Sequence, residues 1–282
     1  MLVKEALMWG ILELEDFTSK QLESRILLAS ILKTTQEGLL IRYNEPISQE
    51  EEKTFYEHIK CRKALEPIAY IVGKKEFYGR DFIVNKHVLI QRPETELIID
   101  RVVLEYQKNF ADKEVTILDL GTGSGAIAVT LAALIPQAKI VATDISDEAL
   151  MLAAENAKLH GAIAQIQFIK SDWYSNLPGK KFDYIISNPP YISPDNKTYM
   201  AQETILYEPE LALFAKENGL INYKKIVSGL NKFLKTENKV FLEIGFNQSE
   251  ALINILKEYQ FTGIVISQDL SGHNRVIEFK LA

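Results

Sequence analysis

A chain of 282 residues is long enough for one large domain, or for a domain of ordinary size with a small companion. Its 47% hydrophobic and 25% charged residues are typical of a globular enzyme, and neither a membrane span nor a signal peptide is evident, so we expect a cytoplasmic protein. The net charge of −6 disfavours a nucleic-acid substrate, and one cysteine with four scattered histidines disfavours a metal site.

The first part of the chain, residues 1–75, has the pattern of a small helical domain. Ser48 and Glu51 have the spacing of a capping box, and Phe55 and Ile59 then lie one helical turn apart. Pro67 ends the helical pattern because proline disfavours helix in the residue before it.

Residues 76–91 are predicted to form a hairpin linker. Two extended runs, Phe77–Val84 and Val88–Ile90, flank a turn predicted at Asn85-Lys86. After Arg92, Pro93 suits the first turn of a helix, so we place the start of a third region, residues 92–282, at this point.

Strand and helix patterns alternate through the third region. Unbroken apolar runs indicate strands buried on both faces, as in a parallel sheet. A short polar turn, Asp269–Asn274, joins the last two strands, so we expect the seventh strand to run antiparallel. The pattern predicts a doubly wound α/β fold with a seven-stranded, mostly parallel sheet and a ligand site at the carboxyl ends of its strands. The predicted strands are Val115–Leu120, Lys139–Thr143, Ile166–Ile169, Phe182–Ser187, Val240–Ile244, Gly263–Ser267 and Arg275–Phe279.

A glycine-rich turn follows the first of these strands and indicates a nucleoside site. Glycine lets the backbone turn tightly and approach a ligand closely. Asp144, at the end of the second strand, is suited to accept hydrogen bonds from both ribose hydroxyls. The turn also satisfies the dinucleotide pattern, so NAD or FAD stays open at this point. The turn residues expected at the cofactor are Gly121, Thr122, Gly123, Ser124 and Gly125.

The third strand ends in a segment suited to an adenine ring. Asp172 offers a carboxylate to the edge of the base, and Trp173 offers an aromatic face. Together with the next motif, this segment favours S-adenosylmethionine over a redox cofactor.

The fourth strand runs into a rigid polar turn, Asn188-Pro189-Pro190-Tyr191, which we predict to bind the substrate and to be catalytic. Two prolines remove two backbone donors, so the carbonyl groups of the turn are predicted to point outward, and Asn188 adds a side-chain acceptor. Asn188 and Pro189 are predicted to accept both hydrogens of a planar NH₂ group, and Tyr191 to stack on it. Holding a delocalised nitrogen in line with a methyl donor needs no metal and no covalent nucleophile.

These motifs make the chain resemble the release factor glutamine methyltransferases (PrmC, also called HemK) over nearly its full length. The resemblance implies a class I, Rossmann-like methyltransferase that moves a methyl group from S-adenosylmethionine, leaving S-adenosylhomocysteine. The acceptor it implies is the side-chain amide nitrogen, N5, of the glutamine in the Gly-Gly-Gln loop of class I peptide chain release factors. The segments carrying the resemblance, besides the two turns, are Glu66–Gly73, Glu76–Gly79, Arg92–Glu96, Tyr207–Leu213, Glu243–Gly245 and Arg275-Val276.

The resemblance also assigns site residues. Gly121–Gly125, Asp144 and Trp173 match the family's cofactor contacts, and Asn188–Tyr191 match its glutamine pocket, with Asn188 reaching both ligands. On this basis residues 1–75, which carry no cofactor motif, are expected to recognise the protein substrate.

Two segments depart from the family pattern. Gln91 stands where the family usually has proline, and Ala215-Lys216 stands where it usually has two glycines. For Arg92, Thr95 and Glu96, a helix start and a direct cofactor role are both consistent with the sequence.

The same turn, Asn188–Tyr191, also occurs in N6-adenine DNA and rRNA guanine methyltransferases, which are the nearest alternatives. They would need a basic face and a target-recognition region, and little chain remains for one. An NAD-dependent oxidoreductase or a non-catalytic nucleotide-binding module would leave this turn without a role. We therefore expect release factors as partners, with no direct nucleic-acid, membrane or metal partner.

Overall fold

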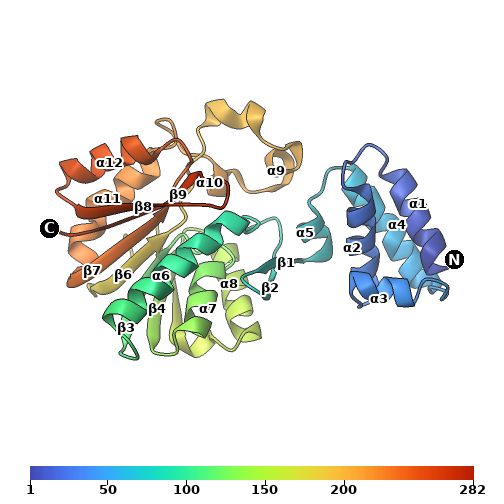
Figure 1. The fold of residues 1–282 in the computed structure, drawn as a ribbon, viewed down its shortest axis with the longest axis horizontal. Coiled ribbons are helices and arrows are strands. Elements are labelled where there is room, and N and C mark those ends of the chain that lie inside the picture. The colour runs from blue at the N-terminus through green and yellow to red at the C-terminus, as the bar shows by residue number, and fades with distance from the viewer. The chain divides into compact units, whose positions relative to one another are not determined.

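The computed structural model describes residues 1–282 and divides into two compact units (Figure 1). The first unit combines Met1–Lys74 with Met200–Tyr207, and the second combines Lys75–Tyr199 with Glu208–Ala282. None of the helices has the length and apolar character that crossing a membrane requires.

The first unit is a small helical bundle around its own apolar core. The core includes Leu27, Leu28 and Phe55, all fully buried. The predicted capping box is present at the start of α4, where the Ser48 hydroxyl accepts from the Glu51 backbone N–H and the Glu51 side chain accepts from the Ser48 N–H. The helices are α1 (Val3–Glu13), α2 (Lys20–Ile31), α3 (Gln36–Ile41), α4 (Gln49–Lys63), α5 (Ile68–Val72) and α9 (Gln202–Tyr207).

A hairpin is present in this region, but the predicted pairing of Phe77–Val84 with Val88–Ile90 was wrong. The paired strands are β1 (Lys74–Phe77) and β2 (Arg80–Ile83), and Val88–Ile90 forms no strand. The turn is Tyr78-Gly79, whose φ angles of 51° and 72° are both positive. Two-residue hairpin turns favour positive φ at both positions because this matches the twist of the strands, and glycine adopts such angles without strain.

The second unit is built on a seven-stranded sheet with the order β5-β4-β3-β6-β7-β9-β8. All neighbours are parallel except β9, which runs antiparallel to β7 and β8, as predicted. The doubly wound fold is therefore confirmed. The strands are β3 (Val115–Leu120), β4 (Ala138–Asp144), β5 (Ile166–Lys170), β6 (Phe182–Ser187), β7 (Leu234–Glu243), β8 (Thr262–Gln268) and β9 (Asn274–Lys280).

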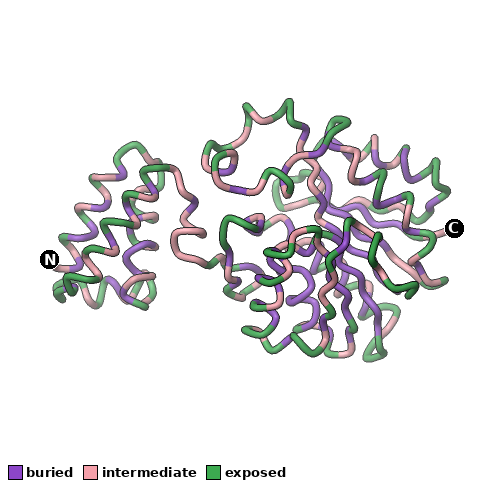
Figure 2. Tube along the Cα trace, turned by 180° about the vertical axis from the view of Figure 1, so that it is seen from behind, coloured by how far each residue is buried: buried purple, intermediate pink, exposed green.

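Helices cover both faces of this sheet. One apolar cluster joins β3 and β4 to α6, α7 and α8, and a second joins β6 and β7 to α11 and α12. Every residue of β3 and of β6 is buried, and the tube of Figure 2 shows these strands as buried segments through the middle of the unit. The helices of the unit are η1 (Pro93–Thr95), α6 (Glu96–Asn109), α7 (Ala126–Leu134), α8 (Asp147–Leu159), η2 (Ile163–Gln165), η3 (Pro194–Tyr199), α10 (Glu210–Leu213), α11 (Ile221–Phe233) and α12 (Ser249–Glu258).

The strand order places a crevice at the carboxyl ends of the central strands. β3 pairs with β4 on one side and with β6 on the other, so the chain reverses its direction of winding between β3 and β6. In doubly wound sheets, ligands bind at this reversal point.

Candidate functional site

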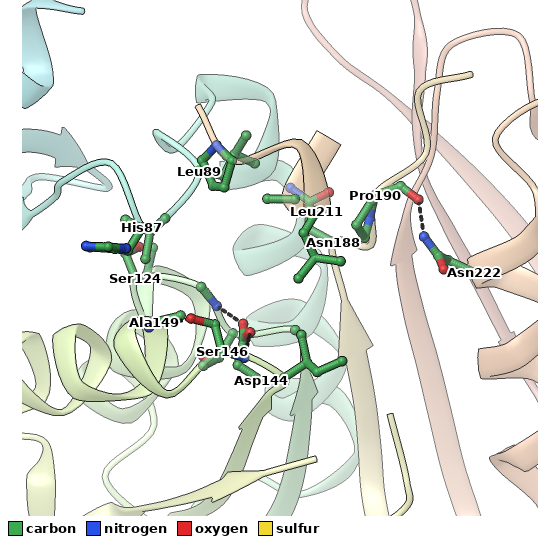
Figure 3. Close-up of a pocket in the computed structure, with 18 of the residues that line it drawn as sticks. His87, Leu89, Ser124, Asp144, Ser146, Ala149, Asn188, Pro190, Leu211 and Asn222 are labelled. Atoms are coloured by element: carbon green, nitrogen blue, oxygen red, sulfur yellow. Dashed lines mark hydrogen bonds between the residues drawn. The ribbon is translucent and has the colours of Figure 1, made fainter. Parts of the chain in front are cut away.

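A cavity of about 410 Å³ opens at the carboxyl ends of β3, β4, β5 and β6 (Figure 3). In Figure 3, Asp144 and Ser146 lie on one side of it, Asn188 and Pro190 on another, and His87 and Leu89 approach from the segment that follows β2. The volume falls within the range typical of small-molecule and cofactor sites.

The glycine-rich turn after β3 forms the floor of the cavity. Gly121, Gly123 and Gly125 have φ angles of 74°, 55° and 81°, which L-residues with side chains rarely adopt. Of the five turn residues predicted at the cofactor, all but Gly125 line the cavity. A Cβ at Gly125 would lie 3.0 Å from the Cβ of Ala153, so this glycine allows α7 and α8 to pack closely.

Asp144 lies at the end of β4 and lines the cavity. Its Oδ2 accepts from the Gly123 N–H at 2.9 Å and its Oδ1 from the Ser146 N–H at 3.0 Å, so the carboxylate joins the glycine turn to the start of α8. Burial raises its pKa, while these backbone donors lower it. Each carboxylate oxygen retains a second lone pair for a ligand hydroxyl.

The segment after β5 supplies a polar and an aromatic wall. Asp172 and Trp173 both line the cavity, and Trp173 also packs against the second apolar cluster. The Trp173 backbone has φ 51°, and the Ser171 hydroxyl donates to the Trp173 carbonyl at 2.9 Å. This bond fixes the backbone of the turn at Trp173.

The turn after β6 is only partly exposed to the cavity. Asn188 and Pro190 line it, whereas Pro189 and Tyr191 do not. The Pro190 carbonyl accepts from the Asn222 side chain at 2.8 Å, and the Tyr191 hydroxyl donates to Glu243 at 3.1 Å. Tyr191 was predicted to stack on the substrate, but here its hydroxyl binds Glu243 and its side chain does not line the cavity. Burial raises the pKa of this hydroxyl.

Glu243, at the end of β7, is a buried polar residue that the sequence placed in a segment of the family resemblance but not at the site. Its Oε2 accepts from the Thr95 hydroxyl at 2.6 Å, and Thr95 Oγ1 accepts from the Asn188 amide at 3.2 Å. Complete burial raises the pKa of Glu243 to about 7, against hydrogen bonds from Thr95 and Tyr191 that lower it. One signal was available, namely a carboxylate ending an apolar strand next to a ligand site.

Gln91, noted in the sequence only as a departure, also lines the cavity. It is 8% exposed, its amide donates to the Ser124 hydroxyl, and its Oε1 is buried without a hydrogen-bond partner. Of the three residues with two possible roles, only Thr95 lines the cavity. Arg92 pairs with Glu208 at 2.6 Å, and Glu96 accepts from the Tyr78 backbone N–H at 2.8 Å.

The cavity joins a glycine floor, a carboxylate at each of two strand ends, an indole wall and an outward amide. Asp144 and Asn188 both line this cavity, so one ligand can contact both side chains. No cluster of three His, Cys, Asp or Glu side chains is arranged to hold a metal ion.

Two family models match the chain. Residues 5–73 match the PrmC N-terminal domain, and residues 99–254, more than half of the chain, match the methyltransferase small domain. Among solved structures, the hMettl16 catalytic domain has a TM-score of 0.58 with 15% identity, covering 83% of each chain. A methyltransferase from Pyrococcus furiosus has a TM-score of 0.51 with 20% identity, covering 80% of this chain and 96% of that one. These two likenesses concern the fold.

Several relatives are similar in sequence. A bifunctional methyltransferase of Rickettsia typhi is 45% identical over 273 residues, which are 92% of this chain and 53% of that protein. The chain thus spans about half the length of such relatives. A release factor glutamine methyltransferase of Enterococcus faecalis is 40% identical over 238 residues, 84% of each protein, and one of Bacillus cereus is 35% identical over 280 residues, 98% of each. The chain therefore belongs to the release factor glutamine methyltransferase family.

Proposed function

We propose that this chain transfers a methyl group from S-adenosylmethionine to the side-chain amide nitrogen of the glutamine in the Gly-Gly-Gln loop of class I release factors. Family membership supports the reaction class. The single observation that carries the proposal is the Asn188 side chain at the cavity wall, whose NH₂ group is engaged by Thr95 so that its Oδ1 is left to accept from a ligand. As release factors act where translation occurs, we also propose a cytoplasmic location.

The cavity suits S-adenosylmethionine along its length. Asp144 would accept from the ribose hydroxyls, and Asp172 and Trp173 would hold the adenine. Gly121–Ser124 would face the methionine moiety of the cofactor. Gly121 and Gly123 have no atom within 4 Å of a built Cβ, so a ligand meets only backbone there.

A glutamine amide is a weak nucleophile because its nitrogen lone pair is delocalised. When bound, S-adenosylmethionine supplies an electrophilic methyl group and leaves as the neutral thioether. Asn188 Oδ1 would accept one N–H of the substrate amide and hold the nitrogen in line with the methyl group. As the new N–C bond forms, positive charge grows on nitrogen, and the same acceptor stabilises it. The proton then leaves the nitrogen for water.

The test is mass spectrometry of release factor after incubation with the chain and S-adenosylmethionine, comparing native Gly-Gly-Gln with a Gly-Gly-Ala variant. We expect one added methyl group on the native loop peptide and none on the variant. Asn188→Ala should lose turnover by on the order of 10²- to 10³-fold, as removal of one preorganised polar partner does, and should lose far less cofactor affinity.

Duplex DNA and rRNA, offered in parallel with labelled cofactor, provide the control. Label that appears only on nucleic acid, or elsewhere on the release factor, would contradict the proposed substrate. Activity of Asn188→Ala within a few-fold of the original chain would contradict the proposed role of this side chain.

A further inference from the structure

We propose that Thr95 and Glu243 are positioning residues for methyl transfer, and that a hydrogen-bond relay from Glu243 through Thr95 decides which end of the Asn188 amide faces the substrate. This inference rests on the function proposed above. It concerns two buried residues: Thr95, which lines the cavity beside Asn188, and Glu243, which lies outside the cavity lining.

The direction of each hydrogen bond follows from the number of hydrogens available. The Thr95 hydroxyl has one hydrogen, and it is donated to Glu243 Oε2 at 2.6 Å. Thr95 Oγ1 is then left only as an acceptor, so it must face the NH₂ end of Asn188, at 3.2 Å. The Asn188 oxygen is thereby turned away from Thr95 and remains an acceptor for a substrate N–H.

Burial makes this relay directional. Thr95 is 5% exposed and Glu243 is 1% exposed, so water does not replace a lost partner at either residue. In such surroundings an unpaired polar group is costly, and the amide adopts the orientation that satisfies its neighbour. If the Asn188 amide were flipped, its Oδ1 would face Thr95 Oγ1, and two acceptors would lie against each other without a hydrogen between them.

The charge of Glu243 sets the direction of the whole relay. As a carboxylate it accepts from Thr95 and, on its other oxygen, from Tyr191 at 3.1 Å. A protonated Glu243 must instead donate one hydrogen. When Thr95 receives it, the Thr95 hydroxyl is freed to donate to Asn188, and the amide turns its NH₂ toward the cavity. Two NH₂ groups then face each other, which disfavours the productive complex.

The groups around Glu243 place this change near neutral pH. Thr95 and Glu94 face it from η1, Tyr191 from the turn after β6 and Arg275 from β9, and the Tyr223 hydroxyl of α11 donates to its backbone carbonyl. Burial raises the pKa of Glu243 to about 7, with a smaller contribution from Glu94, while Thr95, Tyr191 and Arg275 lower it. The positive sulfonium charge of a bound cofactor would favour the carboxylate form of Glu243.

The test is the single-turnover rate of methyl transfer to intact release factor, measured from about pH 5.5 to 8.5 at saturating cofactor. The original chain should show a rate that rises with pH through one ionisation. Thr95→Val, which keeps the side-chain shape without a hydroxyl, should lower the plateau rate by on the order of 10- to 100-fold, since small displacements of reacting groups cost this much. Thr95→Ser should restore it to within a few-fold.

One variant of the acid and one of a hydrogen-bond donor to it distinguish a relay from a simple packing role. Glu243→Gln cannot ionise, and its side-chain oxygen can still accept from Thr95, so its rate should be independent of pH. Tyr191→Phe removes a hydrogen bond that stabilises the carboxylate, so the ionisation in the rate profile should move to higher pH. If Glu243→Gln does not fold, the shift in Tyr191→Phe decides alone. Thr130→Val is the matched control. Thr130 lies in α7, and its fully buried hydroxyl has no hydrogen-bond partner, so the variant should leave the pH profile of the rate unchanged.

A second measurement does not depend on methyl transfer. In ¹⁵N-labelled protein, the side-chain NH₂ resonances of Asn188 should move with the ionisation of Glu243, and should lose this dependence in Thr95→Val. A Thr95→Val variant as fast as the original chain, or a pH profile that Glu243→Gln and Tyr191→Phe leave unaltered, would overturn the relay. If the original chain transfers no methyl group to release factor, the proposed function fails, and the resonances still decide the relay.

Discussion

Asp144 has two tasks at the residue scale, because it joins two segments of the chain and faces the cavity. Its carboxylate accepts from the Gly123 and Ser146 backbone N–H groups. The same oxygens are the acceptors proposed for the ribose. Loss of the side chain should therefore weaken ligand binding in two ways, by removing acceptors for the ribose and by loosening the glycine turn.

We expect Asp144→Ala to weaken S-adenosylmethionine binding by about 1.5–3 kcal/mol, the scale of a hydrogen bond to a charged group. Asp144→Asn, which keeps one acceptor oxygen, should lose less. Calorimetric titration measures both. Asp147→Ala is the control, since Asp147 is exposed, pairs with Lys170 and lies outside the cavity. Equal affinity in Asp144→Ala and Asp147→Ala would remove Asp144 from the cofactor site.

At the scale of elements, the loop between α10 and α11 supports the turn after β6. Its residues Glu217, Asn218 and Gly219 have φ angles of 55°, 55° and 86°, so the chain takes three left-handed residues in a row. A Cβ at Gly219 would lie 2.0 Å from the Tyr191 carbonyl oxygen and 2.4 Å from the Gln248 side-chain nitrogen. This glycine lets the loop pack directly on the backbone of the Asn188–Tyr191 turn.

Gly219→Ala should destabilise the second unit and disturb the Asn188–Tyr191 turn. Gly272→Ala is a matched control, because Gly272 has φ 80° but no atom within 4 Å of a built Cβ. The control should lose only about 1–2 kcal/mol from the left-handed backbone. Gly219→Ala should lose a further ~1–3 kcal/mol from overpacking and lower turnover as well. Urea unfolding gives both free energies. Similar losses in the two variants would mean that the loop gives way without moving the turn.

Residues 215–220 also explain the tolerance of Ala215-Lys216 where the family usually has glycines. The Ala215 backbone N–H donates to the Ile192 carbonyl at 2.8 Å, as in extended chain, and neither residue has a positive φ. Glycine is needed later in the loop, at Gly219, where both the φ angle and the close contact require it.

At the scale of the whole molecule, the helical unit takes up a segment from far along the chain. Arg62, which is 7% exposed at its side chain, pairs with Glu23 at 2.8 Å and with Glu203 at 2.6 Å. The Tyr207 hydroxyl donates to the Ala64 carbonyl at 2.8 Å. Met200–Tyr207 therefore belongs to the first unit, although its neighbours in sequence belong to the second.

All residues that line the cavity belong to the second unit. A chain beginning at Lys75 should therefore bind S-adenosylmethionine within a few-fold of the full chain. If the helical unit recognises the protein substrate, the shortened chain should lose most methylation of intact release factor. It should modify a short Gly-Gly-Gln peptide as well as the full chain does. Binding by calorimetry and methylation by mass spectrometry measure these outcomes.

The shortened chain also removes the partners of Met200–Tyr207, so a control is needed for loosening of that segment. Full-length Arg62→Met breaks the pairs with Glu23 and Glu203 and keeps the helical unit. It should keep much more activity on intact release factor than the shortened chain keeps. Normal modification of intact release factor by the shortened chain would require another role for the helical unit.

The sequence by itself determined the strands of the large sheet and the fold class. Each apolar run of the sheet is local, and burial on both faces leaves the same pattern in any parallel sheet, so all seven predicted strands are present. β7 begins at Leu234, six residues before the predicted start at Val240. The apolar pattern missed this first part of the strand because most of its residues are polar. The capping box of Ser48 was also visible in sequence, since its partners lie three residues apart.

The tertiary structure alone decided which side chains meet. Thr95 and Glu243 are 148 positions apart in sequence, and Arg62 and Glu203 are 141 apart. No local sequence pattern predicts contacts over such separations. The sequence placed Asn188 and Tyr191 in one motif, but only the packing of β6 beside β7 directs the Tyr191 hydroxyl to Glu243 and leaves Asn188 at the cavity. Local sequence patterns reflect interactions between residues that are close in sequence, such as helix caps and buried strand faces. Hydrogen bonds between strand ends depend instead on the order of the strands in the sheet.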